Sequence, residues 1–156
     1  MANILIVSCA KIRDVSCIAC LKCFKAAQLK EGEFAAYDSV QIVGLSGCGD
    51  CPGLVMPKVG LAMEMADYLL QDVDAIHIGT CIVRARNTAA CPIDLEGIQA
   101  KLAAKYGKPV VIGTHNKPSN VIFPSDRIYS IFFFTLITKL FLSSSHIFAY
   151  EKNLLI

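Results

Sequence analysis

The sequence of 156 residues lacks several signatures that would assign it to a common class of protein. No G-x-G-x-x-G follows the first apolar run, and neither a G-x-x-x-x-G-K-[ST] loop nor a G-x-S-x-G elbow is present. Dinucleotide binding, a phosphate loop and serine-hydrolase chemistry therefore find no support. The net charge is only +2, from Lys and Arg residues that form no basic stripe. We therefore expect no nucleic-acid partner.

Long apolar runs and a charged leader are also missing. The apolar stretch of residues 128–142 is interrupted by Lys139 and is shorter than the roughly 18 residues that a membrane-spanning helix needs. We expect no membrane partner, unless this stretch inserts as a tail anchor. The chain runs from Met1 into its first apolar run with no positively charged segment before it, which predicts a cytoplasmic protein.

Cysteine is abundant, with eight residues in all. In a reducing compartment this abundance indicates metal or redox chemistry rather than disulfides. Cys9, the pair Cys48 and Cys51, Cys81, and finally His115 each follow or end a short apolar run. If these runs are parallel strands, the side chains gather at one edge of one sheet, where open α/β sheets bind ligands.

Up to about residue 116, short apolar runs alternate with helical patterns, which predicts a parallel sheet. The expected strands are residues 3–8, 40–45, 74–80 and 109–114. The expected helices carry apolar residues at helical spacing: Leu21, Phe24 and Ala27 (a helix from about Cys20 to Gly32); Val59, Ala62, Met63, Ala66, Leu69 and Leu70; and Leu95, Ile98, Leu102 and Tyr106. The last of these starts near Asp94 and stops at Gly107. We expect a small flavodoxin-like or Rossmann-like three-layer α/β sandwich with about four parallel strands.

The composition changes abruptly after Asn116. Six of the eight Phe residues lie in residues 117–156, together with no Gly and no Cys. We therefore divide the chain into a domain of residues 1–116 and an atypical hydrophobic tail of residues 117–156. The residue types of the tail are those that AT-rich codons encode, and we interpret it as poorly packed or non-native sequence without a function.

The densest cysteine cluster is the run Cys17, Cys20 and Cys23, whose C-x-x-C-x-x-C spacing matches part of the bacterial ferredoxin pattern. On one continuous helix each step of three residues turns a thiol back by about 60°. Three ligands to one metal therefore need a loop before Cys20. The alternative is that these are small buried residues, of which only one or two are functional.

The most specific signal is the turn of Cys48, Gly49, Asp50 and Cys51. Two thiols at this spacing chelate one metal or form a reversible disulfide. A thioredoxin-type dithiol begins a helix, whereas Pro52, Gly53 and Pro57 delay the helix here.

Two further cysteines, Cys81 and Cys91, bracket residues 82–90, which we interpret as a loop between a strand and a helix. His115 follows the last strand at the same edge and is suited to complete a mixed Cys/His site. His77 lies in the middle of a strand, which favours a core position or a position supporting the ligands.

Together these motifs resemble the CGGC domain family, small bacterial and archaeal proteins named for a central Cys-Gly-Gly-Cys. The resemblance covers residues 3 to 115. The matching features are the strand ending at Cys9, the segment Cys23-Phe24-Lys25-Ala26 with Gly32-Glu33-Phe34, the turn Cys48-Gly49-Asp50-Cys51-Pro52-Gly53, the run Ile76-His77-Ile78-Gly79-Thr80-Cys81, Cys91-Pro92, and Gly113-Thr114-His115. Asp50 replaces the second glycine, and Asp tolerates a left-handed backbone better than most residues. The resemblance implies metal binding, most simply of zinc, through cysteines and histidines.

We therefore predict a metal site at the carboxyl edge of the sheet. Its expected core ligands are Cys48, Cys51 and Cys81, with His115 or Cys91 completing a tetrahedron. The remaining cysteines, Cys9, Cys17, Cys20 and Cys23, form the facing wall or a second site. Zinc is the first choice. The alternatives are an iron–sulfur cluster and a dithiol switch at Cys48 and Cys51. The sequence identifies no substrate and no protein partner.

Overall fold

The chain divides into two compact units, Met1–Lys117 and Pro118–Ile156. The computed structural model describes residues 1–15, 21–51 and 53–116, all within the first unit. Cys17, Cys20 and the tail of residues 117–156 lie outside the described residues.

The first unit is built on a four-stranded parallel sheet, as predicted. The strands are β1 (Ala2–Ser8), β2 (Val40–Gly47), β3 (Ala75–Ile78) and β4 (Val110–Ile112), in the spatial order β2-β1-β3-β4. The chain leaves β1 on one side to form β2 and later returns to the other side to form β3. This reversal places a topological switch point at the carboxyl ends of β1 and β3, where α/β sheets of this kind bind ligands.

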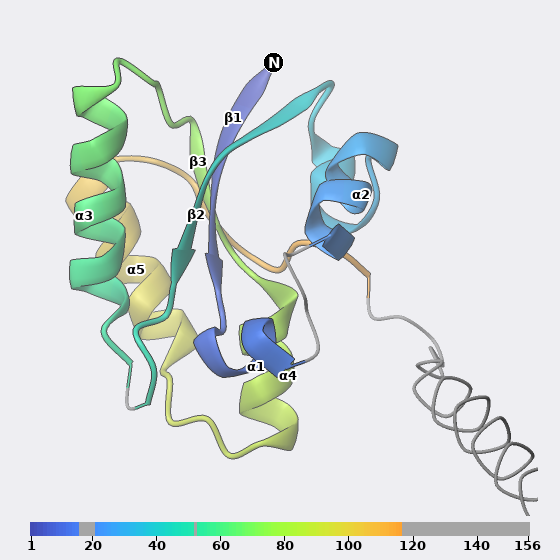
Figure 1. The fold of residues 1–156 in the computed structure, drawn as a ribbon. Coiled ribbons are helices and arrows are strands. Elements are labelled where there is room, and N and C mark those ends of the chain that lie inside the picture. The colour runs from blue at the N-terminus through green and yellow to red at the C-terminus, as the bar shows by residue number, and fades with distance from the viewer. Residues whose placement is uncertain (16–20, 52, 117–156) are drawn as a thin grey trace, which may run out of the picture. The chain divides into compact units, whose positions relative to one another are not determined.

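Helices cover both faces of the sheet and its carboxyl end. They are α1 (Ala10–Val15), α2 (Leu21–Leu29), the 3-10 helix η2 (Gly32–Ala36), α3 (Val55–Tyr68), α4 (Thr80–Thr88) and α5 (Leu95–Tyr106). Figure 1 shows α3 and α5 on one side of the sheet, α2 on the other, and α1 and α4 where β1 ends. The predicted α/β sandwich is thus confirmed.

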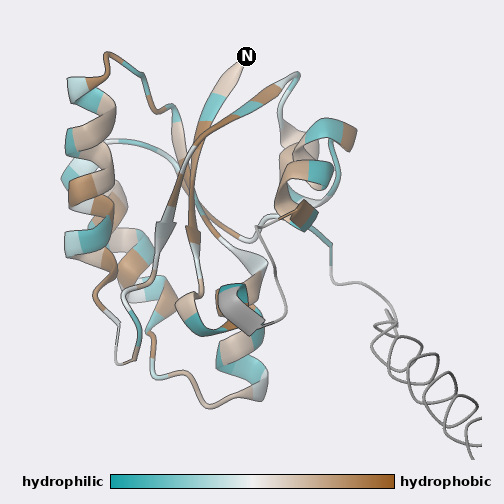
Figure 2. Cartoon of the chain, viewed as in Figure 1, coloured by the Kyte–Doolittle hydropathy of each residue, from teal (hydrophilic) through white to brown (hydrophobic). Residues whose placement is uncertain are grey.

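The alternation of β1 divides the core into two parts, because successive side chains of a strand point to opposite faces. Leu5 and Val7 pack in the cluster under α3 and α5. Ile4 and Ile6 pack with Phe34 on the opposite face. Figure 2 shows hydrophobic colour along the strands of the sheet.

The ends of α5 follow the predicted capping signals. The Asp94 side chain accepts a hydrogen bond from the Gly97 N–H at 3.0 Å, which satisfies one of the free donors of the first turn. Gly107 closes the helix with a φ of 63°, a left-handed conformation that glycine adopts without steric cost.

Two helices differ from the expectation. Residues 82–90 were predicted as a loop, but Thr80–Thr88 form α4. Its sequence is poor in strong helix formers, and burial of Ile82 and Ala85, three residues apart, stabilises the helix instead. The short helix α1 was not predicted either, because six residues are too few to show a period.

The sequence also predicted that the apolar stripe of the helix after β2 continues to Leu69 and Leu70, and the structure corrects this end. Leu69 and Leu70 follow α3 and are 64% and 94% exposed. Leu70 has a left-handed φ of 54°, so the helix cannot continue through it, and the chain returns to the sheet with the buried Val73. Within the described ranges no helix has the length and apolar character needed to cross a bilayer.

Candidate metal-binding thiol pocket

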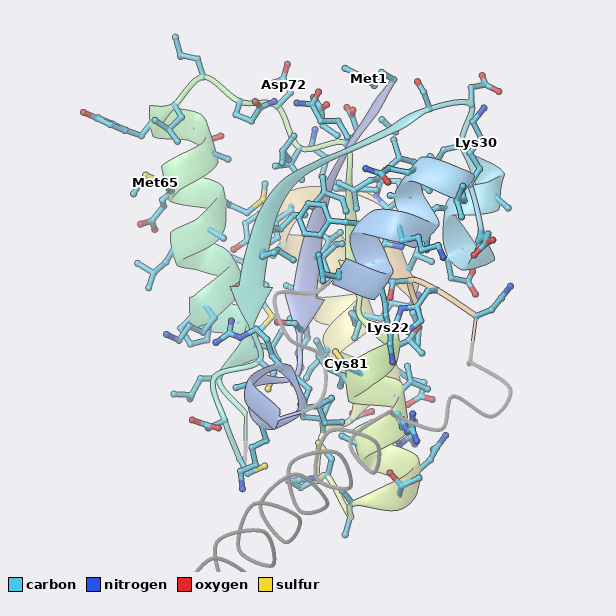
Figure 3. The ribbon with its side chains drawn as sticks, turned by 45° about the vertical axis from the view of Figure 1, so that its right-hand side comes forward. Met1, Lys22, Lys30, Met65, Asp72 and Cys81 are labelled. Carbon is cyan, nitrogen blue, oxygen red and sulfur yellow. The ribbon has the colours of Figure 1, made fainter. Side chains whose placement is uncertain are left out.

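Three strands deliver cysteines to the carboxyl edge of the sheet. Cys9 follows β1, Cys48 follows β2, and Cys81 lies in the first turn of α4 after β3. The Cys48 N–H donates to the Ser8 carbonyl at 2.8 Å, so the chain after β2 stays paired with the end of β1. Figure 3 shows Cys81 at this end of the sheet.

The C-x-x-C turn is shaped by left-handed backbone conformations. Gly49 and Asp50 have φ values of 78° and 62°. A Cβ on Gly49 would lie 2.7 Å from the Cβ of Leu54, so only glycine fits at that position. The turn closes where the Leu54 N–H donates to the Cys48 carbonyl at 2.8 Å. The left-handed backbone considered for Asp50 is therefore observed, and α3 begins only at Val55, after the motif, as expected.

Four cysteines from separate parts of the chain line one cavity of about 100 Å³, which we call the thiol pocket. They are Cys9, Cys48, Cys51 and Cys91. The remaining lining is mostly apolar: Ile12, Ile82, Ala85, Ala89 and Ile93, with Lys11 and Asp50. Cys9 and Cys48 are buried, Cys91 is half-buried and Cys51 is exposed. All four are thiols and none is part of a disulfide.

Backbone N–H groups point at sulfur atoms in and beside the thiol pocket. The Ala10 N–H donates to Cys48 Sγ at 3.4 Å, and the Cys9 N–H donates to Cys81 Sγ at 3.1 Å. Cys81 thus lies directly beside the pocket, although it is not among the lining residues.

Burial and neighbouring thiols disfavour the charged form of Cys9 in the thiol pocket. Burial raises the pKa of the Cys9 thiol, and the neighbouring Cys48 and Cys91 raise it further. The N–H groups of Ile12 and Lys11 act in the opposite direction. Several thiolates in one small cavity would repel one another. A bound cation would offset this repulsion and favour loss of the thiol protons.

His115 lies with a different cysteine. Its Nδ1 is 3.6 Å from Cys23 Sγ and 3.2 Å from Thr114 Oγ1. We call these three residues the Cys23–His115 cluster. Burial lowers the pKa of His115, as does the charge of Lys22. Cys23 packs with Ile4 and Phe34 on the face opposite the main core, and no member of the cluster lines the thiol pocket.

His77 is completely buried and its two ring nitrogens both have protein partners. Nδ1 lies 3.0 Å from the Gly113 carbonyl, and Nε2 lies 2.9 Å from the Tyr37 hydroxyl. Since a carbonyl only accepts, Nδ1 carries the proton and Nε2 accepts from Tyr37. Burial lowers the pKa of His77, which keeps the ring neutral. The ring therefore has no nitrogen left for a metal, in keeping with a core position.

The donor set of the thiol pocket fits a soft metal ion, since thiolates with N–H partners in apolar surroundings are the ligands that such ions prefer. In the part of the chain that the structure describes, no three His, Cys, Asp or Glu side chains stand in an arrangement that would hold a metal ion. Binding an ion would therefore draw the thiols closer together. Lys11 also lines the thiol pocket. The sequence pattern gave no signal for it, although it follows Cys9 by two residues.

Comparisons with known proteins agree with the cysteine pattern. A curated protein of Methanocaldococcus jannaschii, described as uncharacterized, is 35% identical over 118 residues, which are 72% of this chain and 86% of that protein. No solved structure gives a significant match. The model of the CGGC domain matches residues 3–115, a range that contains the thiol pocket and all of the sheet except its first residue, Ala2. The chain therefore belongs to the CGGC domain family.

Proposed function

We propose that this protein binds one thiophilic metal ion in the thiol pocket, through Cys9, Cys48, Cys51 and Cys91. The observation that carries the proposal is the convergence of these four thiols, from three separate loops, on one cavity at the switch point of the sheet. If these four positions served only packing, other small hydrophobic side chains would fill them equally well, and four sulfur atoms would not need to meet at one cavity. Family membership supports the same role.

Zinc is the ion we propose. Tetrahedral sites of four cysteines, including one C-x-x-C pair, are typical of structural zinc. Cys81, whose Sγ accepts from the Cys9 N–H beside the pocket, is a further candidate ligand. A pocket of reduced thiols also agrees with a reducing compartment, and we place the protein in the cytoplasm.

The direct test is the metal content of the full chain, expressed without a His tag and purified without oxygen. Elemental analysis should find about one zinc per chain in colourless protein, as four thiolates from one pocket imply. Cys9→Ser should lose most of the metal. Cys23→Ser is the matched control, because it removes a buried cysteine from the other face and should keep the metal.

Other outcomes would replace the proposal. A brown protein with iron and sulfide would indicate an iron–sulfur cluster. Metal-free protein in which Cys48 and Cys51 cycle between dithiol and disulfide would indicate a redox switch, a function that the exposure of Cys51 beside the buried Cys48 favours. Equal loss of zinc in Cys9→Ser and Cys23→Ser would show that the thiol pocket is not the binding site.

A further inference from the structure

The Cys23–His115 cluster joins a thiol to a base, and the metal site proposed above does not use it. Cys23 belongs to the first turn of α2, and His115 belongs to the segment that follows β4. Figures 1 and 3 show these two parts of the chain side by side. Cys23 Sγ is hydrogen-bonded to His115 Nδ1 at 3.6 Å. A base within hydrogen-bonding reach of a cysteine is the arrangement that activates the thiol as a nucleophile.

The ring of His115 is available for proton transfer, in contrast to that of His77. Both ring nitrogens of His77 have protein partners. Within the described ranges, Nδ1 of His115 contacts Cys23 and Thr114, and Nε2 has no hydrogen-bond partner. Burial and the charge of Lys22 lower the pKa of His115, which keeps the ring neutral at pH 7. A neutral ring with its proton on Nε2 accepts the Cys23 proton at Nδ1.

The two threonines of this edge leave one hydroxyl proton for the sulfur. The Thr80 hydroxyl donates to the His115 carbonyl at 2.9 Å, so Thr80 Oγ1 accepts from the Thr114 N–H at 3.0 Å. Three acceptors lie around the Thr114 hydroxyl: Cys23 Sγ at 3.3 Å, Thr80 Oγ1 at 3.3 Å and His115 Nδ1 at 3.2 Å. When Cys23 ionises, this hydroxyl can donate to the thiolate, because a charged acceptor forms the stronger bond.

The backbone that carries His115 is held on its other side by η2. The Glu33 N–H donates to the Thr114 carbonyl at 3.0 Å. Gly32 has a φ of 62°, and a Cβ there would lie only 2.9 Å from the His115 Cα. The close approach of η2 therefore requires glycine and fixes the position of the imidazole relative to the sheet. A base held in this way is positioned for repeated proton transfer to and from one sulfur.

We propose that Cys23 is a modification site at which the thiol exchanges with a small disulfide, with His115 as the base. His115 Nδ1 takes the Cys23 proton, and the thiolate attacks one sulfur of the disulfide. A new S–S bond joins Cys23 to that sulfur and the original S–S bond breaks. The leaving thiolate then takes the proton from His115 Nδ1. Cys23 is oxidised and the leaving half of the disulfide is reduced, so the exchange needs no other reactant.

The chemistry of the cluster suits a disulfide better than an acyl substrate. Exchange requires a thiolate and a proton for the leaving sulfur, which Cys23 and His115 supply. Acyl transfer also requires donors aimed at an oxyanion, and the N–H groups of Thr80 and Thr114 are already engaged. The positive charge of Lys22, next to Cys23 in the chain, favours a thiolate and an anionic disulfide.

The position of the sulfur limits the size of the reactant. Cys23 is 3% exposed, whereas His115, which is hydrogen-bonded to its sulfur, is half-buried. The sulfur therefore lies one side chain below the surface. Oxidised glutathione, a small and anionic disulfide, is the probe that these features select.

Reaction of the full, reduced chain with oxidised glutathione at pH 7 tests the proposal. Trypsin cleaves after Lys22 and Lys25, so residues 23–25 form a peptide that separates Cys23 from Cys17 and Cys20. Mass spectrometry of this peptide measures how fast its free thiol is lost. The loss should be about tenfold faster in the folded protein than in the chain unfolded in urea, a modest part of what a positioned base contributes. A cysteine that only fills space would react more slowly when folded, and that result would overturn the proposal.

Substitution of the base separates activation from simple access. His115→Gln should slow the loss about tenfold, to the rate of the unfolded chain. Its circular dichroism and metal content should stay unchanged, because the Cys23–His115 cluster does not line the thiol pocket. His146→Gln is the matched control, since it makes the same substitution in the second unit and should keep the wild-type rate. A folded His115→Gln protein that reacts as fast as the wild type would refute the role of His115 and with it the proposal.

Discussion

The polar and sulfur-bearing side chains have different surroundings on the two faces of the sheet. On the face that α3 and α5 cover, the thiols of Cys9, Cys48 and Cys91 converge on a cavity at the carboxyl edge. On the other face, His77 and Thr114 are fully buried and engaged by protein groups on all sides. The cysteines on the first face line a cavity, whereas His77 and Thr114 on the second face are fully enclosed by protein atoms.

This difference separates the proposed metal site from a structural network of hydrogen bonds. Buried polar groups need partners, and Thr114 has them: its N–H donates to Thr80 Oγ1 at 3.0 Å, while its hydroxyl lies near Cys23 and His115. The network joins the start of α4, the end of β4 and α2. We infer that it fixes the edge of the sheet, against which the thiol pocket forms.

On the proposed function the largest expected effect is the removal of metal, because the binding energy of a structural metal is also folding energy. Adding a strong chelator to the wild type should lower the unfolding temperature by more than about 10 °C, as a loss of some 3 kcal/mol implies. Differential scanning calorimetry measures this shift. In the double variant Cys48→Ser/Cys51→Ser the chelator should change nothing. An equal shift in both proteins would mean that the metal stabilises some other site.

The next largest effect is the truncation of His77. His77→Ala leaves a cavity and removes the partner of Tyr37 and of the Gly113 carbonyl, so we expect a destabilisation of about 3 kcal/mol in urea. Tyr37→Phe removes only the hydroxyl and should cost about 1 kcal/mol. On the proposed function, both variants should bind as much zinc as the wild type does. Loss of zinc from a folded His77→Ala protein would show that the two faces are coupled.

The pH dependence of the free energy of unfolding tests whether His77 is buried as a neutral ring. Burial lowers the pKa of His77 in the folded protein, although the Gly113 carbonyl and Glu33 oppose the shift. The unfolded state therefore binds the proton more tightly. The stability that His77 contributes should be complete above pH of about 6.5 and fall at lower pH by at most about 1.4 kcal/mol per pH unit.

Urea unfolding of wild type and His77→Ala at a series of pH values measures this contribution as the difference between the two proteins. The difference should narrow as the pH falls. A constant difference between pH 7 and the acid limit of folding would contradict a neutral buried ring.

The smallest effect concerns Asp50 in the C-x-x-C turn. Asp50→Gly restores the residue that gives the family its name and should change the free energy of unfolding by less than about 1 kcal/mol, because Asp already tolerates the left-handed backbone. Asp50→Val, with a β-branched side chain at a φ of 62°, should destabilise the protein by about 1 to 2 kcal/mol. Equal stability of the two variants would mean that the turn is not held in this conformation.

The sequence by itself determined the four strands, the helix α5 and the edge at which the cysteines gather. Runs of β-branched residues that end at Cys9, Cys48 and Cys81 identified parallel strands with a shared carboxyl edge. Asp94 and Gly107 defined α5 because capping depends on local hydrogen bonds and local backbone angles. For Asp50 the sequence indicated only that a left-handed backbone would be tolerated there, and the structure shows that this backbone is adopted.

Only the tertiary structure decided which of these residues meet. A residue just beyond a strand can fall on either face of the sheet, because the path of the following loop, rather than the alternation of the strand, sets its direction. Cys91 therefore joins Cys9 in the thiol pocket, while His115, which follows β4 at the same edge, turns to Cys23. The helix α4 depended on burial in the same way, since its own sequence favours helix only weakly.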